Sequence, residues 1–181
     1  PTTLFGYATS ELSQDAFFAW LISRGDKNYK GKVHDISCLF ISKLIGQQYK
    51  KPISDVSVNQ QRKHIDIEAE INHEILLIIE DKTFTKQHDN QLSNYLSSAN
   101  EVADKKNMKL VSVYLKTGNE SNAETNSVSD EGFKVFYRND ILKCLNSNTT
   151  ENDILKDYIS YLEKFEADTK SFRINPFNNW S

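Results

Sequence analysis

The sequence predicts an α/β domain in which helices flank a mixed central β-sheet. The stretch His64–Ile71 alternates polar and apolar residues, as a half-buried strand does. The next stretch, Ile75–Ile79, is an uninterrupted apolar run of the length expected for a strand buried on both faces. A helical pattern separates it from a third strand, Met108–Leu115, and such a β-α-β crossover makes these two strands parallel. A hairpin combined with a crossover gives a sheet of mixed direction.

Length and composition fit one globular domain. The chain has 181 residues, of which 38% are hydrophobic and 26% charged, enough for a substantial core. We expect a single domain over residues 1–165 and a tail, 166–181, that packs back on the core or leads into a further region. No apolar run approaches the ~20 residues of a membrane span, and the N-terminal stretch lacks the features of a signal peptide. Cys38 and Cys144 lack metal-ligand spacing, so we expect buried, reduced thiols in a cytoplasmic protein without membrane contacts.

Two helices and a strand are expected before the alternating stretch. Residues 10–23 form the first helix, because acidic residues occupy its first turns and a glycine follows it. Its predicted apolar face consists of Leu12, Ala16, Phe17, Trp20 and Leu21. A second helix is predicted over Val33–Gln48. The Val- and Ser-rich stretch Ser54–Gln60 should then pair with the His64–Ile71 strand.

After the buried strand, the pattern predicts a helix over His88–Ala103. The stretch Thr117–Glu131 is polar and acidic, and we expect a mobile surface loop there. Phe133–Tyr137 reads as a short last strand. Helices over Asp140–Leu145 and Asn152–Phe165 complete the predicted elements.

Three charged residues, Glu80, Asp81 and Lys82, end the buried strand. Desolvated charges are costly unless they are paired or bind something. Side chains alternate along a strand, so Glu80 and Lys82 share one face and Asp81 lies on the other. In a hairpin, Asp66 comes near Glu80, and two carboxylates and an ammonium converge. Such oxygen ligands suit Mg²⁺ or Mn²⁺, and the lysine can orient or deprotonate a water. The alternative is a salt-bridged strand end on an unrelated α/β protein.

This pattern resembles the active-site motif of the PD-(D/E)XK nuclease superfamily. Asp66 stands fourteen positions (80 − 66) before the Glu80-Asp81-Lys82 run. Ile65 replaces the proline that precedes the aspartate in the family pattern. The opening Ser10–Phe17 stretch resembles the acidic first helix of one group of these nucleases, and the resemblance covers about residues 8–96. It implies a restriction-endonuclease-like core.

The resemblance also implies catalytic and metal-binding roles. Asp66 and Glu80 would hold Mg²⁺, with help from the backbone carbonyl of Asp81, and Mn²⁺ would substitute for it. Lys82 would position the attacking water and stabilise the pentacovalent transition state. Glu11 would assist the metal as an outer carboxylate; in the alternative interpretation it only complements the helix dipole.

A third set of residues lies on the predicted helix after the strand. Gln91 and Tyr95 resemble the Gln-x-x-x-Tyr element of the RecB-like branch, and their spacing of four places them on one helix face. In the functional interpretation Gln91 bonds a phosphate or base, and Tyr95 stacks or bonds near the metal. Alternatively, Tyr95 belongs to the core. His88 either contacts a phosphate or caps the helix.

Together, these features and the resemblance predict a Mg²⁺-dependent deoxyribonuclease; the resemblance implies DNA as its partner and allows a homodimer or a larger assembly. The net charge of −3 does not itself indicate nucleic-acid binding. However, lysines and arginines gather between Lys30 and Lys63, before the carboxylates of Asp66–Asp81, and would steer a polyanion toward them. In the alternative interpretation, which we favour for most of these lysines, they are ordinary solvated surface residues. The alternatives are a nucleic-acid-binding module that does not cleave and a protein-interaction subunit.

Overall fold

A five-stranded mixed β-sheet forms the centre of the computed structural model, which describes residues 3–8, 11–62, 65–82, 91–119, 122–146 and 151–174. Neighbouring strands pair antiparallel from β1 to β3 and parallel from β3 to β5. The predicted fold class is therefore confirmed. The strands, in their order across the sheet, are β1 (Val56–Arg62), β2 (Ile65–Ile71), β3 (Ile75–Lys82), β4 (Lys109–Lys116) and β5 (Lys134–Tyr137).

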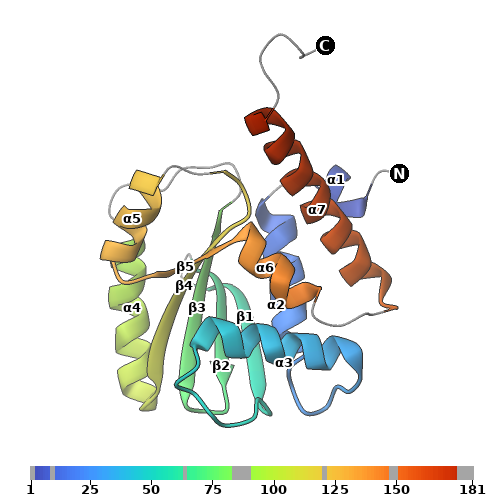
Figure 1. The fold of residues 1–181 in the computed structure, drawn as a ribbon. Helices are drawn as coiled ribbons and strands as arrows, with labels where there is room; N and C mark the ends of the chain where they lie inside the picture. The colour runs from blue at the N-terminus through green and yellow to red at the C-terminus, as the bar shows by residue number, and fades with distance from the viewer. Residues whose placement is uncertain are drawn as a thin grey trace.

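Helices cover both faces of this sheet (Figure 1). One face carries α4 and α5, and the other carries α2, α3, α6 and α7, so the domain has three layers. Among the helices of the described residues, none is both long and apolar enough to cross a membrane. Their bounds are α1 (Leu4–Tyr7), α2 (Glu11–Ser23), α3 (Lys32–Ile45), α4 (Gln91–Lys106), α5 (Asn122–Asp130), α6 (Arg138–Leu145) and α7 (Asp153–Ile174).

Strand β3 is buried on both faces, as its apolar run predicts. Its odd-numbered side chains, such as Leu77 and Ile79, pack in the cluster that contains Phe18 of α2. Its even-numbered side chains, such as Leu76, pack in the cluster that contains Leu92 of α4. Because each face is covered, any polar group on β3 is removed from water unless it lies at the end of the strand.

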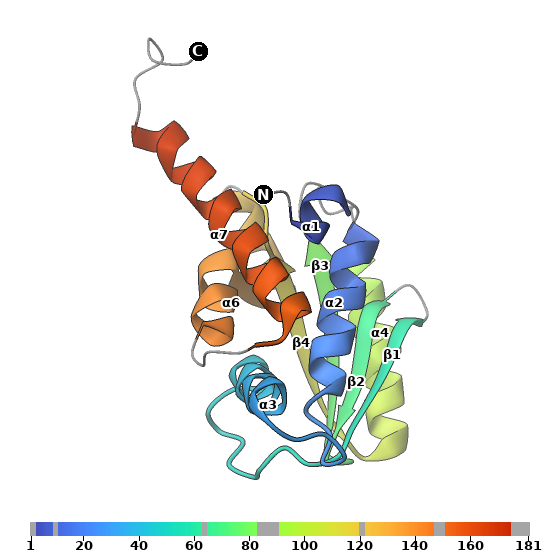
Figure 2. The same cartoon turned by 90° about the vertical axis from the view of Figure 1, so that its right-hand side faces the viewer.

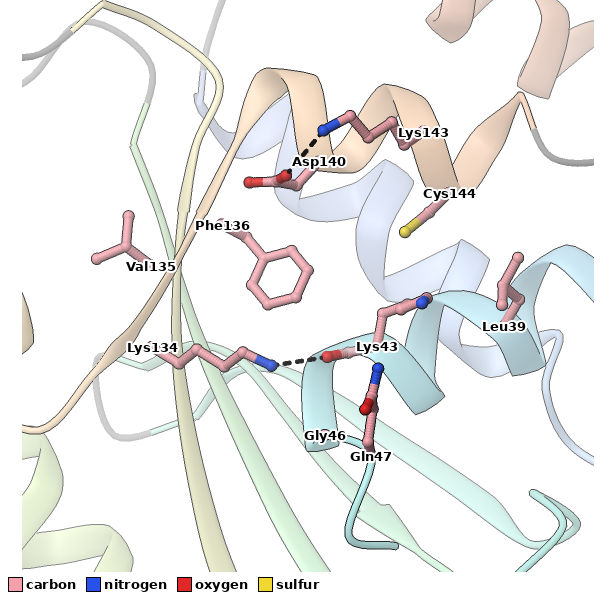
Figure 3. Close-up of a pocket in the computed structure, with 10 residues that line it drawn as sticks. All are labelled: Leu39, Lys43, Gly46, Gln47, Lys134, Val135, Phe136, Asp140, Lys143 and Cys144. Atoms are coloured by element: carbon pink, nitrogen blue, oxygen red, sulfur yellow. Dashed lines mark hydrogen bonds and ion pairs between the residues drawn. The ribbon is translucent and has the colours of Figure 1, made fainter. Parts of the chain in front are cut away.

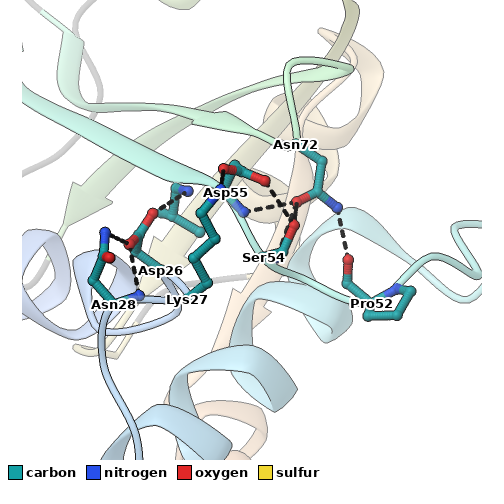
Figure 4. Close-up of polar contacts among 8 residues, drawn as sticks. Asp26, Lys27, Asn28, Pro52, Ser54, Asp55 and Asn72 are labelled. Carbon is teal, nitrogen blue, oxygen red and sulfur yellow. Dashed lines mark hydrogen bonds and ion pairs between the residues drawn. The ribbon is translucent and has the colours of Figure 1, made fainter.

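The β2–β3 hairpin turn is fixed by Asn72, at the end of the sheet away from Lys82. Asn72 and His73 have φ angles of 53° and 54°, which Asn tolerates better than most residues. The Asn72 Oδ1 atom accepts hydrogen bonds from the backbone N–H groups of Ser54 and Asp55, 2.9 and 3.0 Å away. Its Nδ2 atom donates to the Pro52 carbonyl oxygen at 2.7 Å (Figure 4). These bonds tie the hairpin to the chain that enters β1 and so help set the strand register.

Two expectations about the C-terminal half are wrong. The predicted loop Thr117–Glu131 contains helix α5, because Val128 turns inward and is 1% exposed against the α4-side core. The last helix was expected to end at Phe165 but continues to Ile174. Its extension is stabilised because the Thr169 hydroxyl is buried beside Arg138.

The predicted buried face of the first helix also needs correction. Leu12 and Ala16 were expected inside, yet both are exposed. Helix α2 lies between the sheet and α7 (Figure 2), so a different and wider face is covered. The buried residues of α2 are Gln14, Asp15, Phe17, Phe18, Leu21 and Ile22.

Candidate active site

The β2–β3 hairpin brings Asp66 to the end of β3 that carries Glu80. Ile67 pairs with Ile79 at the last position of the described register, and Asp66 and Glu80 are the next residues along β2 and β3. The Asp66 Oδ2 atom also accepts a hydrogen bond from the backbone N–H of Asp81 at 2.9 Å, which holds the carboxylate at the strand end.

Lys82 joins these carboxylates to the first turn of α2. Its Nζ atom lies 2.8 Å from Glu80 Oε1, 3.7 Å from Asp66 Oδ2 and 3.9 Å from Glu11 Oε2. Burial lowers the pKa of Lys82, but the Glu80 hydrogen bond and the neighbouring carboxylates outweigh this and raise it above its usual value. Lys82 is therefore an ammonium at neutral pH. It can donate hydrogen bonds and balance negative charge, whereas its protonation argues against a role as a proton acceptor in this arrangement.

Glu80 is the most enclosed of the carboxylates around Lys82, with a side chain that is 2% exposed. Burial, and next the charge of Asp66, raise the pKa of Glu80 to about 7 although Lys82 opposes the shift. The Glu80 Oε2 atom is buried and has no hydrogen-bond partner among the described residues. The Lys82 ammonium thus does not fully compensate Glu80, and a further cation beside it would favour the ionised form of Glu80.

The Asp81 carboxyl group points to the opposite face of β3, as strand alternation predicts. It is fully buried, and neither of its oxygens has a hydrogen-bond partner in the described part of the chain. Burial, followed by the charges of Asp15, Asp66 and Glu11, raises the pKa of Asp81 well above its usual value. Its surroundings in the layer under α2 thus favour the protonated form of the side chain, and a metal-binding role for Asp81 through its backbone carbonyl stays a prediction.

Asp15 is a neighbour of the site that the sequence analysis missed. It lies one turn after Glu11 on α2 and is 3% exposed. Burial raises the pKa of Asp15 to about 7, the charges of Asp66 and Glu11 add to the shift, and Lys82 reduces it. The signal in the sequence was the spacing of four between Glu11 and Asp15, which places both on one helix face.

The residues predicted to bind nucleic acid are only partly described. Tyr95 lies on α4, half-buried, and packs against the α4-side core that contains Leu92 and Ala99. This position favours the core interpretation of Tyr95. The side chain of Gln91 and the whole of His88 lie outside the described residues, so their roles stay predictions.

The metal expected here can be tested against the donor groups present. In the part of the chain that the structure describes, no group of three or more His, Cys, Asp and Glu side chains could hold a metal ion. Mg²⁺, however, is commonly bound by one or two carboxylates and several waters. The Asp66 and Glu80 carboxylates, which both lie beside Lys82, fit that requirement, and Glu80 has a buried oxygen without a hydrogen-bond partner among the described residues.

The sheet is mixed, and Asp66 of β2 meets Glu80 and Lys82 at the end of β3. These features define an α/β domain with a carboxylate–lysine site. The family model for the PD-(D/E)XK nuclease superfamily matches residues 4–167, and the chain belongs to this superfamily. Such nucleases generally use divalent metals such as Mg²⁺. No curated protein and no solved structure matches the chain. The family match does not distinguish branches of the superfamily, so the RecB-like assignment with its Gln-x-x-x-Tyr element stays a prediction.

Proposed function

We propose that the protein is a Mg²⁺-dependent nuclease that hydrolyses phosphodiester bonds in DNA. The observation that carries the proposal is the position of the Lys82 ammonium, within 3.9 Å of the Glu80, Asp66 and Glu11 carboxylates at one end of the sheet. Membership of the superfamily supports nuclease chemistry in general. The choice of DNA rests on family analogy, which is weaker than an argument from the site itself.

Each residue of the site has a role that its surroundings support. Asp66 and Glu80 would hold the metal, which when bound would activate a water and neutralise charge on the phosphate. Lys82, kept protonated by its carboxylate neighbours, would orient the attacking water and balance the charge that develops in the transition state. Glu11 would hold Lys82 or a metal-bound water from the α2 side.

The nucleic acid would approach the same end of the sheet. Gln91 is the first residue of α4, and its side chain would contact a phosphate or base there. His88 precedes it in the sequence and would add a second phosphate contact. Tyr95, being half-buried, would act mainly by positioning α4.

The experiment is a cleavage assay on linear, circular and single-stranded DNA with Mg²⁺, Mn²⁺ or EDTA. The Lys82→Ala variant should lose at least about 100-fold in rate, because a preorganised charge contact to a transition state contributes this much in comparable sites. The matched control is Lys106→Ala, which removes another lysine–glutamate pair, to Glu70 on β2, at the far end of the strand. It should cleave at the wild-type rate.

Two results would count against the proposal. Wild-type turnover in Lys82→Ala would exclude the role given to that residue. Cleavage that persists in EDTA would exclude metal dependence. If no DNA is cleaved, calorimetric titration with Mg²⁺ shows whether the metal still binds. A protein that binds Mg²⁺ at Asp66 and Glu80 but cleaves no DNA would be a binding module or would act on RNA.

A further inference from the structure

A second concave site lies on the same face of the sheet as α2 but away from Lys82, between α3, β5 and α6. Its cavity volume is about 740 Å³, within the range of small-molecule sites. Figure 3 shows side chains from all three elements around it. None of them belongs to the carboxylate–lysine site.

Three lysines surround this cavity, each from a different element: Lys43 from α3, Lys134 from β5 and Lys143 from α6. The one carboxylate among the lining residues, Asp140, lies 3.7 Å from Lys143 Nζ. The described lining therefore carries three positive charges and one negative charge, an excess that attracts anions.

Lys134 is held in place before any ligand arrives. Its Nζ atom donates to the Lys43 backbone carbonyl at 2.9 Å and lies 4.7 Å from the centre of the Phe136 ring. One of its three N–H groups is used in this way, and others are available to a ligand. Burial lowers the pKa of Lys134, and the charge of Lys43 lowers it further, whereas the charge of Asp140 raises it. An anion between Lys43 and Lys134 would relieve the repulsion between these two lysines.

The remaining wall of the cavity is apolar. Leu39 of α3, Phe136 of β5 and Cys144 of α6 line it, and Phe136 and Cys144 are almost fully buried. The Gln47 side chain, which is exposed at the edge of the site, supplies an amide that can both donate and accept hydrogen bonds. A flat ring with polar edges suits such a wall better than a bare inorganic anion does.

We propose that this cavity binds a nucleoside monophosphate, with its phosphate between Lys43, Lys134 and Lys143 and its base against the apolar wall. Charge complementarity selects the phosphate, and the volume and the apolar surface select the nucleoside. The ligand could be a free nucleotide or the phosphorylated end of a nucleic-acid strand. The proposal stands whether or not the carboxylate–lysine site cleaves DNA.

The test is calorimetric titration of the whole protein in EDTA, with thymidine 5′-monophosphate, thymidine and inorganic phosphate as probes at up to about 5 mM. The monophosphate should bind more tightly than either fragment. Lys43→Gln should raise its Kd at least tenfold, because charge-assisted hydrogen bonds are strong. Lys32→Gln, an exposed lysine at the start of the same helix, is the matched control and should leave Kd unchanged.

A second comparison identifies the source of the ligand. A 5′-phosphorylated oligonucleotide that binds better than its 5′-hydroxyl form, with the difference lost in Lys43→Gln, would support a strand end. A preference for the free nucleotide alone would support the same site with a small-molecule ligand. The proposal is overturned if the monophosphate does not bind, if inorganic phosphate binds as well as the nucleotide, or if Lys43→Gln binds like wild type.

Discussion

Among the described residues, several carboxyl groups surround the Lys82 ammonium at the end of β3. Lys82 contacts Glu80 closely and Asp66 and Glu11 more distantly, while Asp15 and Asp81 approach from the other side of the strand. Burial and mutual repulsion hold protons on some of these groups near neutral pH. The free energy of unfolding should therefore depend on pH, and replacing one of these carboxyl groups by an uncharged amide should reveal its share of that dependence.

Asp15→Asn should stabilise the protein at alkaline pH. The pKa of Asp15 is about 7 in the fold against 3.8 as its ordinary value, so the folded state binds the proton more tightly than the unfolded state. The stability linked to this proton is complete below about pH 4 and is lost as pH rises toward and through 7. Asn has no proton to lose, so its advantage over Asp15 should grow across that window to about 1–3 kcal/mol at pH 8.

Urea unfolding in EDTA at pH 5 and pH 8 measures this difference. Asp104→Asn, on the exposed side of α4, is the control and should change stability equally at both values. If Asp15→Asn showed the same difference from wild type at pH 5 and pH 8, the raised pKa of Asp15 would be wrong.

The periodicity of a single element predicts which of its side chains share a face, but it does not predict which distant elements those side chains contact. Strand alternation was enough to place Glu80 with Lys82 and to turn Asp81 away, and the hairpin brought Asp66 to them. Asp15 was missed because its spacing from Glu11 places both on one helix face but does not show which face of α2 is buried. Contacts from distant parts of the chain decide this, as at the adjacent Gln14, which accepts from the Tyr158 hydroxyl of α7 at 2.9 Å across 144 residues.

Among the elements, α6 and α7 are joined by one buried arginine. The Arg138 Nε atom donates to Glu166 Oε2 at 2.7 Å, and its Nη1 atom donates to the Thr117 carbonyl oxygen at 2.7 Å. The guanidinium also lies 4.5 Å from the centre of the Phe165 ring. Because Thr117 follows β4 directly, this residue links α7 to the end of the sheet near which Lys82 lies.

Arg138→Ala should destabilise the protein by about 3 kcal/mol, since it leaves Glu166 and the Thr117 carbonyl without their buried donor. Lys156→Ala, which breaks the exposed pair with Glu151, should cost no more than about 1 kcal/mol. Urea midpoints with an unchanged m value give both numbers. A loss in Arg138→Ala as small as that in Lys156→Ala would show that α7 is held by its apolar face alone.

Sequence patterns predicted the strands better than the C-terminal helices, for a physical reason. β3 carries a continuous apolar run and β4 carries one that only Ser112 interrupts, so the local sequence is enough to identify both strands. α5 has few apolar residues, and its inward-facing Val128 is a weak signal. The end of α7 was missed because Glu166 and Thr169 both bond Arg138, which is distant in sequence.

At the scale of the whole molecule, α1 packs against the first turns of α7, the last helix of the described chain. Phe5 of α1 contacts Tyr158 of α7 edge-on, with ring centres 4.8 Å apart, and contacts Phe17 of α2 at 5.5 Å. The Phe5 backbone N–H also donates to Asp157 Oδ2 at 3.2 Å. Figure 2 shows α1 above the start of α2 and beside α7. α2 carries Glu11 and Asp15, so this aromatic cluster supports the helix that completes the candidate active site.

Phe5→Ala should therefore weaken the entire domain and not only its N-terminal turn. Removing a ring that is 7% exposed should cost about 3 kcal/mol, and the far-UV and near-UV circular dichroism transitions should shift together. Tyr7→Ala removes a side chain of the same short helix that is 77% exposed, and it should change stability by less than about 0.5 kcal/mol. If the near-UV signal of Phe5→Ala melted before the far-UV signal, α1 and α7 would form a separate unit. Coincident transitions would instead mean that the fold, and with it the position of Glu11 beside Lys82, is lost in one cooperative step.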